Sequence, residues 1–499
     1  MEEQLAAVLR DADQFQPASH APGSPPFAAT GPGTMSEQEI RRREKEQFVS
    51  GLTGTSMEEV HRVMLVAVFS YLALKLIIHQ FGHGSSYLAR VPRPIRWLLE
   101  FAFLVAVPNA AVLWPDLLAH RATICAMFGL LVAVAYPRPG SLARMPPSHA
   151  HMKEWTRQLN DRVKPAVTVY RALMMSLTCF AILAVDFHVF PRRFAKTEVF
   201  GTSLMDIGVG CFVFSQGLTV GLKQGSTSAS TPSVWASIRR GWPLWLLGLG
   251  RVISVKGLDY QEHVSEYGVH WNFFFTLAAL GPIVVFLDRW VRWSDAPMAA
   301  MLLIDYEVLL AKGLQHYVLT APRTNLISAN REGLTSLFGY VAIFLAARHV
   351  GRTLASPLPT VTAWRRLLFR TLAPQIALTA AALWVARTAF LTDVSRRLCN
   401  APFVLWTVAV NAGMVALLVL VDAVVFTDSA TAAIEVADAV NANGLVVFLG
   451  ANLATGAVNM VVDTLRVPDA AAVAVLSAYM SSVVLVALGM YRMRWIVKF

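Results

Sequence analysis

The segment from Val185 to Ser215 reads VDFHVFPRRFAKTEVFGTSLMDIGVGCFVFS and places many ionisable side chains between two strongly apolar stretches. Each flanking stretch has the length of about 20 residues that a transmembrane helix needs. An unpaired charge buried in a membrane protein costs several kcal/mol, so ionisable residues at such positions are usually functional. The segment therefore predicts two transmembrane helices joined by a loop whose charged side chains form a site.

The composition of the whole chain also indicates a membrane protein. Hydrophobic residues make up 55% of the chain and charged residues only 15%, whereas an ordinary soluble domain has about 25% charged residues. The mean hydropathy is +0.50. The net charge of +11 is spread over short loops between apolar runs. Because the sequence has no nucleic-acid-reading motif, we assign this charge to lipid headgroups and topology and expect no nucleic acid partner.

The fold class predicted is all-α, a polytopic transmembrane bundle of about 13 helices, because helices or closed barrels alone satisfy their backbone groups in lipid. No internal repeat is evident, so residues 59–499 are predicted to form one domain. Residues 1–58 are polar and rich in Pro and Gly, which predicts a disordered tail. The predicted spans are 63–81, 97–114, 118–136, 167–186, 204–222, 242–256, 271–288, 297–314, 333–347, 372–390, 401–425, 444–463 and 470–491.

Basic residues in two loops give the orientation, because such loops usually stay in the cytosol. The loop after the third predicted span carries Arg138, Arg144, Lys153, Arg157, Arg162 and Lys164. The loop after the ninth carries Arg348, Arg352, Arg365, Arg366 and Arg370. Segments 186–203, 257–270 and 314–332 are then expected to share the opposite side, which is the lumen in a protein of the endoplasmic reticulum.

In the first of these segments, Asp186 ends an apolar run and Lys196 follows ten residues later. Burial raises the proton affinity of a carboxylate and a nearby cation lowers it. Such a pair could take a proton from a hydroxyl group and stabilise an oxyanion. The alternative is a topological anchor, in which Arg192, Arg193 and Lys196 reach lipid phosphates and Asp186 pairs with them. The spacing alone leaves both interpretations open.

Two features of the following helix have structural explanations. Ser203 and Asp206 have the spacing of a capping box, which we favour over a catalytic role for Asp206. Gly217 and Gly221 form a G-x-x-x-G pair, which indicates close helix packing.

The second segment contains Glu262, Glu266 and His270 at intervals of four residues. They match no established zinc signature, so we predict no metal site. His270 and Asn272 stand at a predicted membrane edge, where they could bind a headgroup or cap the next helix.

In the third segment, Arg331 could bind a phosphate bidentately or form a local salt bridge with Glu332 or Asp186. Further along, Asn452 and Asn459 are seven residues apart on one predicted helix face. They could bind a ligand, although a bond to a neighbouring helix is the simpler explanation.

Four separated blocks resemble the glycosylphosphatidylinositol (GPI) inositol acyltransferase family. They are the opening segment, EYGVHWN at 266–272, NREGLTSLFGY at 330–340 and ANLATGAVN at 451–459. The resemblance implies a multi-pass enzyme of the endoplasmic reticulum membrane. Such an enzyme transfers a fatty acyl chain from acyl-CoA to the inositol ring of glucosaminyl-phosphatidylinositol during GPI-anchor biosynthesis.

The resemblance also bears on the site. It implies that Asp186 and Lys196 are catalytic, and it makes His270 a candidate base or hydroxyl-binding group. The sequence has no nucleophile elbow or suitable acyl-cysteine, so we expect direct transfer in a ternary complex. We assign substrate binding to Arg192, Arg193, His270, Asn272, Arg331, Glu332 and Asn452.

The expected partners are glucosaminyl-phosphatidylinositol, membrane lipids and acyl-CoA, with palmitoyl-CoA as the expected co-substrate and no cofactor. A function of a different class remains open. Buried Asp, Glu and Lys would also suit a secondary transporter or lipid flippase with a charged lumen-facing site. A scaffold for other anchor-synthesis enzymes is a third possibility.

Overall fold

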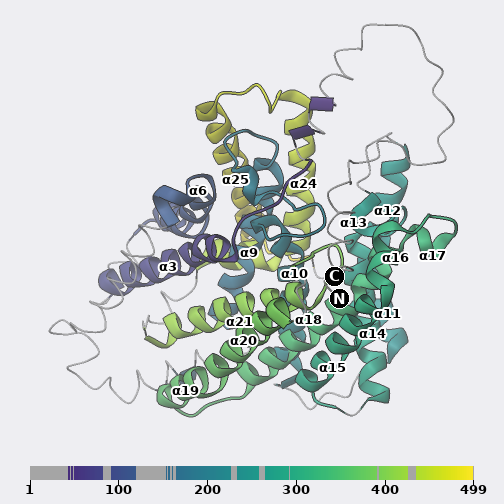
Figure 1. Ribbon diagram of the computed structural model, residues 1–499. Coiled ribbons are helices and arrows are strands. Elements are labelled where there is room, and N and C mark those ends of the chain that lie inside the picture. Colours follow the sequence, from purple (N-terminus) through teal and green to yellow (C-terminus); the bar gives the residue numbers. More distant parts are fainter. Residues whose placement is uncertain are drawn as a thin grey trace, which may run out of the picture. The chain divides into compact units, whose positions relative to one another are not determined.

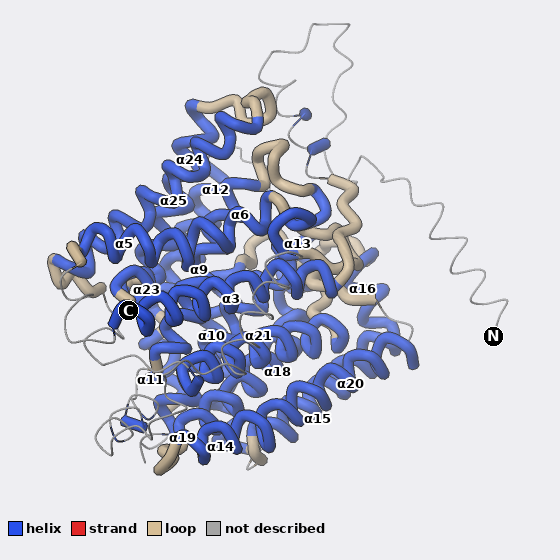
Figure 2. Tube along the Cα trace, turned by 90° about the vertical axis from the view of Figure 1, so that its left-hand side faces the viewer, coloured by secondary structure: helices blue, strands red, loops and turns tan. Residues whose placement is uncertain are grey.

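A computed structural model describes residues 43–44, 47–48, 50–82, 91–119, 153, 156–157, 160, 164–225, 233–257, 264–291, 293–389, 393–424 and 434–497. Residues from Val49 onward form one compact unit. Within the described part of that unit every regular element is helical (Figure 2). This confirms the predicted all-α polytopic bundle.

Ten helical segments among the described residues are long and apolar enough to cross a membrane. Their sequences are nearly continuous apolar runs, so their backbone groups are satisfied within each segment. These segments are Met57–Ile78, Arg93–Leu113, Pro165–Ala184, Leu204–Gly225, Phe273–Trp290, Arg331–Ala355, Thr362–Thr388, Ala401–Ala423, Gly444–Val461 and Asp469–Arg492. Ten of the thirteen predicted spans therefore correspond to a candidate span in the structure.

The other three predicted spans differ. Most of 118–136 lies outside the described residues. The run 242–256 forms α12 (Trp242–Gly257), which is shorter than the candidate spans. The run 297–314 divides into α15 (Asp295–Leu309) and the π-helical turn η4 (Leu310–Leu314), in which Gly313 has a φ of 114°. That left-handed conformation suits glycine and interrupts the helix, so the count of thirteen stays a prediction.

The other described elements form the candidate spans and the segments between them. They are α3 (Met57–Gly82), α5 (Arg93–Phe101), η1 (Ala102–Ala106), α6 (Val107–Leu113), η2 (Pro115–Ala119), α9 (Pro165–Ala184), η3 (Arg192–Phe194), α10 (Leu204–Gly225), α11 (Val234–Arg240), α13 (Val264–Tyr267), α14 (Phe273–Trp290), α16 (Gln315–Thr320), α17 (Leu326–Ala329), α18 (Arg331–Ala355), α19 (Val361–Leu367), η5 (Leu368–Leu372), α20 (Ala373–Ala389), α21 (Ala401–Val424), α23 (Glu435–Ala442), α24 (Gly444–Val461) and α25 (Asp469–Arg492).

Helices α10 and α18 pack side by side (Figure 1) and share the most extensive contact of any two described helices. A Cβ atom at Gly217 would lie 2.3 Å from the carbonyl oxygen of Phe344, and one at Gly221 would lie 2.2 Å from that of Arg348. Since no larger residue fits without a shift of the backbone, the glycines allow the two helices to touch. The G-x-x-x-G pair therefore has the packing role that we predicted.

One assignment of the sequence analysis is wrong. The arginines that we placed in the loop after the ninth span lie in helical elements: Arg352 in α18, which continues to Ala355, and Arg365, Arg366 and Arg370 in α19 and η5. Arg348 also lies in α18. Its side chain is only 1% exposed and its guanidinium donates to both carboxylate oxygens of Asp288, each at 2.6 Å, and to Asp295 at 2.7 Å. These carboxylates compensate the buried charge, which lets the helix extend past the arginine.

Residues 1–42 of the predicted tail lie outside the described residues. Its last residues are described and contact the loop that follows α9. The amide of Thr55 donates to the carbonyl of Thr202 at 2.7 Å, and the amide of Gly51 donates to the Glu198 carboxylate at 3.2 Å. The chain is thus held against this loop before α3 begins.

Candidate functional site

The three segments predicted to share one side lie together, among the tan loops beside α13 in Figure 2. Lys196 Nζ in the first segment donates to Glu266 Oε1 in the second at 2.8 Å. The amide of Val269 in the second donates to the carbonyl of Ala329 in the third at 2.9 Å. The predicted convergence of these segments is therefore confirmed.

The side chain of Arg192 stabilises the backbone of the loop that follows α9. Its guanidinium donates to three backbone carbonyls, those of Val185 at 2.7 Å, Phe190 at 3.2 Å and Phe187 at 3.3 Å. Burial lowers the pKa of Arg192 to about 10, and the nearby Asp186 carboxylate opposes this shift. Three fully buried side chains pack beneath the loop: Phe187, Phe190 and Phe194. Arg192 thus shapes the backbone around the site.

Asp186 lies two residues after α9 and is partly exposed. Its Oδ2 accepts a hydrogen bond of 2.7 Å from Nδ2 of Asn459 in α24. Asn452, which we had assigned to substrate binding, instead donates to the carbonyl of Phe448 in its own helix at 2.7 Å. Of the two asparagines, it is Asn459 that reaches the predicted base.

Lys196 belongs to a chain of alternating charges that we call the Arg396 cluster: Lys196, Glu266, Arg396 and Asp206. Its ammonium is 43% exposed and bonded to Glu266. Arg396 Nη2 lies 3.3 Å from the same Glu266 oxygen, and Arg396 Nε donates to Asp206 Oδ1 at 2.8 Å. Burial alone would lower the pKa of Arg396, but Glu266 and Asp206 raise it above the ordinary arginine value.

Asp206 anchors this cluster from inside the protein, where it is fully buried. Its carboxylate accepts from the amide of Thr197 at 3.2 Å and from the Thr197 hydroxyl at 2.9 Å. Its own amide donates to Ser203 Oγ at 3.1 Å, so Ser203 caps the helix as predicted, whereas the Asp206 carboxylate bonds Thr197 and Arg396 and does not complete the capping box. Because Thr197 adjoins Lys196, the carboxylate of Asp206 fixes the backbone from which the lysine projects.

The sequence analysis did not identify Arg396 or its neighbour Arg397. A signal was available, since these arginines follow a predicted span and should face the lumen, against the positive-inside rule. Basic residues on that side need a compensating partner. Arg396 finds Asp206, and Arg397 Nη2 donates to Glu332 Oε1 at 3.3 Å.

Arg331 and Glu332 are both buried. Arg331 Nε donates to the carbonyl of Val318 at 2.8 Å and Nη1 to that of Ser328 at 3.1 Å. Glu332 is fully buried and accepts from Arg323 at 2.6 Å, while Arg331 Nε lies 3.7 Å away. The local salt bridge that we considered as an alternative is therefore present.

His270 and Asn272 stand in the turn before α14. Asn272 accepts from the amides of Phe274 and Phe275 at 3.1 and 3.4 Å, so it caps the helix. The amide of His270 donates to Asn330 Oδ1 at 2.7 Å, and its side chain is partly exposed. Asn272 therefore caps α14, which is one of the two roles that we considered for it. His270 is held beside the third segment by the bond of its amide to Asn330.

Arg193 contacts the start of α3, where Nε donates to Glu59 Oε1 at 2.9 Å. It is 39% exposed. Among the described residues no group of three His, Cys, Asp or Glu side chains is arranged to hold a metal ion. Glu262 and His263 lie outside the described residues.

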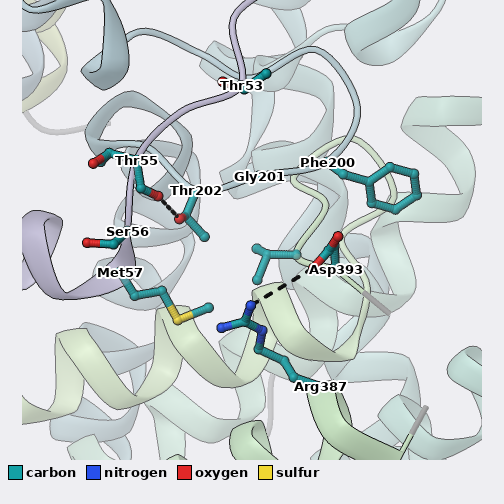
Figure 3. Close-up of a pocket in the computed structure, with 10 residues that line it drawn as sticks. Thr53, Thr55, Ser56, Met57, Phe200, Gly201, Thr202, Arg387 and Asp393 are labelled. Carbon is teal, nitrogen blue, oxygen red and sulfur yellow. Dashed lines mark hydrogen bonds and ion pairs between the residues drawn. The ribbon is translucent and has the colours of Figure 1, made fainter. Parts of the chain in front are cut away.

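A pocket of about 390 Å³ is lined in part by the loop between α9 and α10 (Figure 3). It contains Phe200, Gly201 and Thr202 and residues from the start of α3 and the end of α20. An adjoining pocket of about 530 Å³ runs along α20 and shares Met57, Arg387 and Asp393 with the first.

Comparison with known proteins gives a consistent result over almost the whole chain. The family model GWT1 matches residues 41–490. The chain is 36% identical to a protein of Yarrowia lipolytica over 92% of this chain and 98% of the relative. It is 39% identical to one of Gibberella zeae (90% and 97%) and 32% identical to one of Saccharomyces cerevisiae (92% and 99%). All three relatives are named GPI-anchored wall transfer protein 1.

Proposed function

We propose a function from one premise: the chain belongs to the GWT1 family. The name of its relatives points to a role in the biosynthesis of GPI anchors. We propose that the chain is an O-acyltransferase of the endoplasmic reticulum membrane whose charged loops face the lumen. Its acceptor would be the inositol ring of glucosaminyl-phosphatidylinositol, and its donor an acyl-CoA such as palmitoyl-CoA.

In this proposal Asp186 removes the proton from an inositol hydroxyl while the oxygen attacks the thioester carbonyl carbon. Lys196 stabilises the oxyanion that forms. The carbon–sulfur bond then breaks, an ester remains on inositol, and the CoA thiolate takes up a proton to leave as the thiol. The three cysteines in the described part of the chain, Cys179, Cys211 and Cys399, are buried. Their burial supports direct transfer, since a buried thiol cannot readily accept an acyl group from CoA.

One observation carries the choice of Asp186 and Lys196. Four charged groups at or beside these loops are almost completely buried: Asp206, Arg331, Glu332 and Arg396 are at most 5% exposed. Asp186 and Lys196 are partly exposed, and each is held by a side chain from a distant segment, Asn459 or Glu266. Partial exposure with a fixed position is what a group needs in order to meet a substrate.

The test is transfer of labelled palmitoyl from palmitoyl-CoA to glucosaminyl-phosphatidylinositol by the purified full-length chain. Asp186→Asn and Lys196→Ala should each lower the rate by about 10²-fold or more, as expected for loss of an acid–base or oxyanion-stabilising group. Exposed Asp469→Asn and Lys312→Ala serve as charge-matched controls and should keep the wild-type rate.

Equal loss in the control variants would contradict the assignment of these two residues. Absence of transfer by the wild-type chain, together with movement of the lipid across the bilayer, would favour the transporter or flippase instead.

A further inference from the structure

The hydroxyl of Tyr340 differs from those of the other buried tyrosines. In the described part of the chain the buried tyrosines are Tyr71, Tyr170, Tyr306, Tyr340 and Tyr479. All except Tyr340 donate a hydrogen bond to a carboxylate, an amide or a backbone carbonyl, at distances of 2.5 to 3.2 Å. No described residue bonds the hydroxyl of Tyr340, although the residue is only 1% exposed.

An unbonded hydroxyl in a protein interior requires an explanation, because burying a polar group without a partner costs free energy. Completely enclosed polar atoms without a partner occur elsewhere in the described chain, for example in Asn109 and Gln216, but the oxygen of Tyr340 is not among them. Protein atoms therefore do not seal this oxygen, although the ring packs in the core. A polar group of a ligand can reach the oxygen and accept its hydrogen bond.

Tyr340 lies on a face of α18 that contacts the loops of the site. Gly333 precedes it by seven residues on the same face, and a Cβ atom there would lie 2.6 Å from the carbonyl oxygen of Tyr267 in α13. A Cβ atom at Gly339 would lie 2.1 Å from the carbonyl oxygen of Cys399, in the turn before α21. Side chains of a helix lean toward its N-terminus, which in α18 is the end where these loops meet. The phenol therefore leans toward the site.

The Arg396 cluster is within electrostatic range of this phenol. The charges of Glu266 and Arg396 act on Tyr340 and also on Tyr267, which follows Glu266 in the chain. Burial, and then the Glu266 carboxylate, raise the pKa of Tyr267 above its ordinary value. A phenol in these surroundings keeps its proton, so it donates a hydrogen bond and does not serve as a base. Lys196 also bonds Glu266, so its ammonium and the phenol of Tyr340 share this carboxylate as a neighbour.

We propose that Tyr340 is a further catalytic residue, which donates a hydrogen bond to the thioester carbonyl oxygen of the acyl donor. When the inositol oxygen attacks the carbonyl carbon, the carbon–oxygen double bond opens and negative charge collects on this oxygen. Tyr340 and Lys196 then stabilise the oxyanion together, and Tyr340 keeps its proton. The double bond forms again as the carbon–sulfur bond breaks. This inference rests on the proposed acyl transfer and adds a second donor to it.

The burial of Tyr340 favours the thioester carbonyl over a hydroxyl of the inositol ring. A hydrogen bond to a developing oxyanion is strongest where water is excluded, and a donor that is already fixed needs no reorganisation during the reaction. Tyr340 is fixed in α18 and almost completely buried, whereas Lys196 is 43% exposed. The thioester joins an apolar chain to the polar CoA, so its carbonyl suits this boundary between the core and the exposed loops.

The test compares two variants that each remove one phenolic hydroxyl from the full-length chain. Tyr340→Phe should lower kcat for transfer of labelled palmitoyl roughly 10²-fold, the loss expected for one oxyanion donor. KM for palmitoyl-CoA and for glucosaminyl-phosphatidylinositol should change less than about twofold, because the interaction forms mainly in the transition state. The unfolding temperature in detergent should stay the same or rise, since the lost hydroxyl has no partner in the protein.

Tyr170→Phe is the matched control. Tyr170 is also 1% exposed, but its hydroxyl donates to Oδ1 of Asn411 at 2.6 Å. Its removal should lower the unfolding temperature, because the buried amide loses a partner, and should leave kcat unchanged. The two variants therefore have opposite effects on stability and on rate.

An unchanged kcat in folded Tyr340→Phe protein would overturn the inference. A raised KM for glucosaminyl-phosphatidylinositol with unchanged kcat would also overturn it, since the hydroxyl would then bind the inositol ring. Rates are measured well below the unfolding temperature and expressed per folded molecule, so lost activity cannot come from unfolding. Full transfer by Tyr340→Phe would leave the proposed function intact, whereas absence of transfer by the wild type would overturn both.

Discussion

Two buried arginines in this molecule each pair with two carboxylates, but the partners come from different kinds of structural element. Arg396 lies between Asp206 and Glu266, and Arg348 lies between Asp295 and Asp288. In each case one carboxylate is almost completely buried and has a second partner. Asp206 also accepts from Thr197, and Asp295 also pairs with Arg352. We call the second set the Arg348 cluster: Asp288, Asp295, Arg348 and Arg352.

The exposed cations of the two clusters are also alike, since Lys196 is 43% exposed and Arg352 is 40% exposed. The Arg348 cluster joins regular helices, with Asp288 in α14, Asp295 at the start of α15 and both arginines in α18. The Arg396 cluster joins the loop that carries Lys196, the short helix α13, the turn before α21 and the first turn of α10, where Asp206 lies. The same ionic arrangement therefore holds helices together at one end of α18 and positions exposed loop residues at the other.

The largest expected effect comes from removing each arginine in turn. Arg396→Met and Arg348→Met should each lower the free energy of unfolding by about 3–5 kcal/mol, because each leaves a buried carboxylate without its counterion. Acyl transfer per folded molecule should be lost in Arg396→Met, since Glu266 and Lys196 lose their support, and kept in Arg348→Met. Thermal unfolding in detergent and transfer measured well below the unfolding temperature check both statements. Similar loss of transfer in both variants would remove the distinction.

A smaller effect tests whether helix contact at the Arg348 end is as tight as the geometry indicates. Gly221→Ala should cost about 1–3 kcal/mol, because the added Cβ would meet the carbonyl of Arg348 at 2.2 Å. Gly208 in the same helix has no atom within 4 Å of the corresponding position. Gly208→Ala should therefore leave the unfolding temperature unchanged or raise it. Equal destabilisation by both substitutions would show that the contact is not specific.

The smallest effect concerns Asp438. Its carboxylate lies near another carboxylate, that of Glu435, whereas Asp206 and Asp295 pair with arginines. Burial, and then the neighbouring Glu435, raise the pKa of Asp438 to about 6. The pKa of Asp438 is higher in the folded than in the unfolded protein. Its contribution to the stability of the fold is therefore fully present below about pH 4, and it is lost as the pH rises through about 6. Asp438→Asn should thus raise the free energy of unfolding by about 1 kcal/mol at pH 7.5 after allowance for partial exposure.

The measurement for this last prediction is the unfolding temperature of both proteins between pH 5 and pH 8. The difference should grow with pH and should be clearly smaller at pH 5 than at pH 8. A difference that is constant across the range would mean that Asp438 does not titrate as described.

Local sequence patterns predicted much of the architecture. Ten apolar runs became candidate spans, Ser203 caps its helix, and Gly217 and Gly221 permit close packing, because each of these features depends on residues near in sequence. The reach of α18 past Arg348 was missed because a buried charge is tolerated only when distant carboxylates surround it. Hydropathy alone ends a helix at such a residue.

The site was only partly predictable for the same reason. The chemistry of Asp186 and Lys196 could be suggested from their own segment, and their resemblance to a family block strengthened the suggestion. Their partners Asn459 and Glu266 are separated from them by 273 and 70 residues. No spacing rule links residues so far apart, so these contacts required the packed structure.

The bond between Asp186 and Asn459 also sets the earliest time at which the proposed site can be complete. A ribosome delivers the chain from its N-terminus at about 5–20 residues per second, so roughly tens of seconds separate the synthesis of these two residues. Throughout that interval the growing chain already carries the aspartate but lacks the asparagine that holds it. The partner arrives only with α24, so a nascent chain released before this helix would contain Asp186 without the asparagine that bonds it.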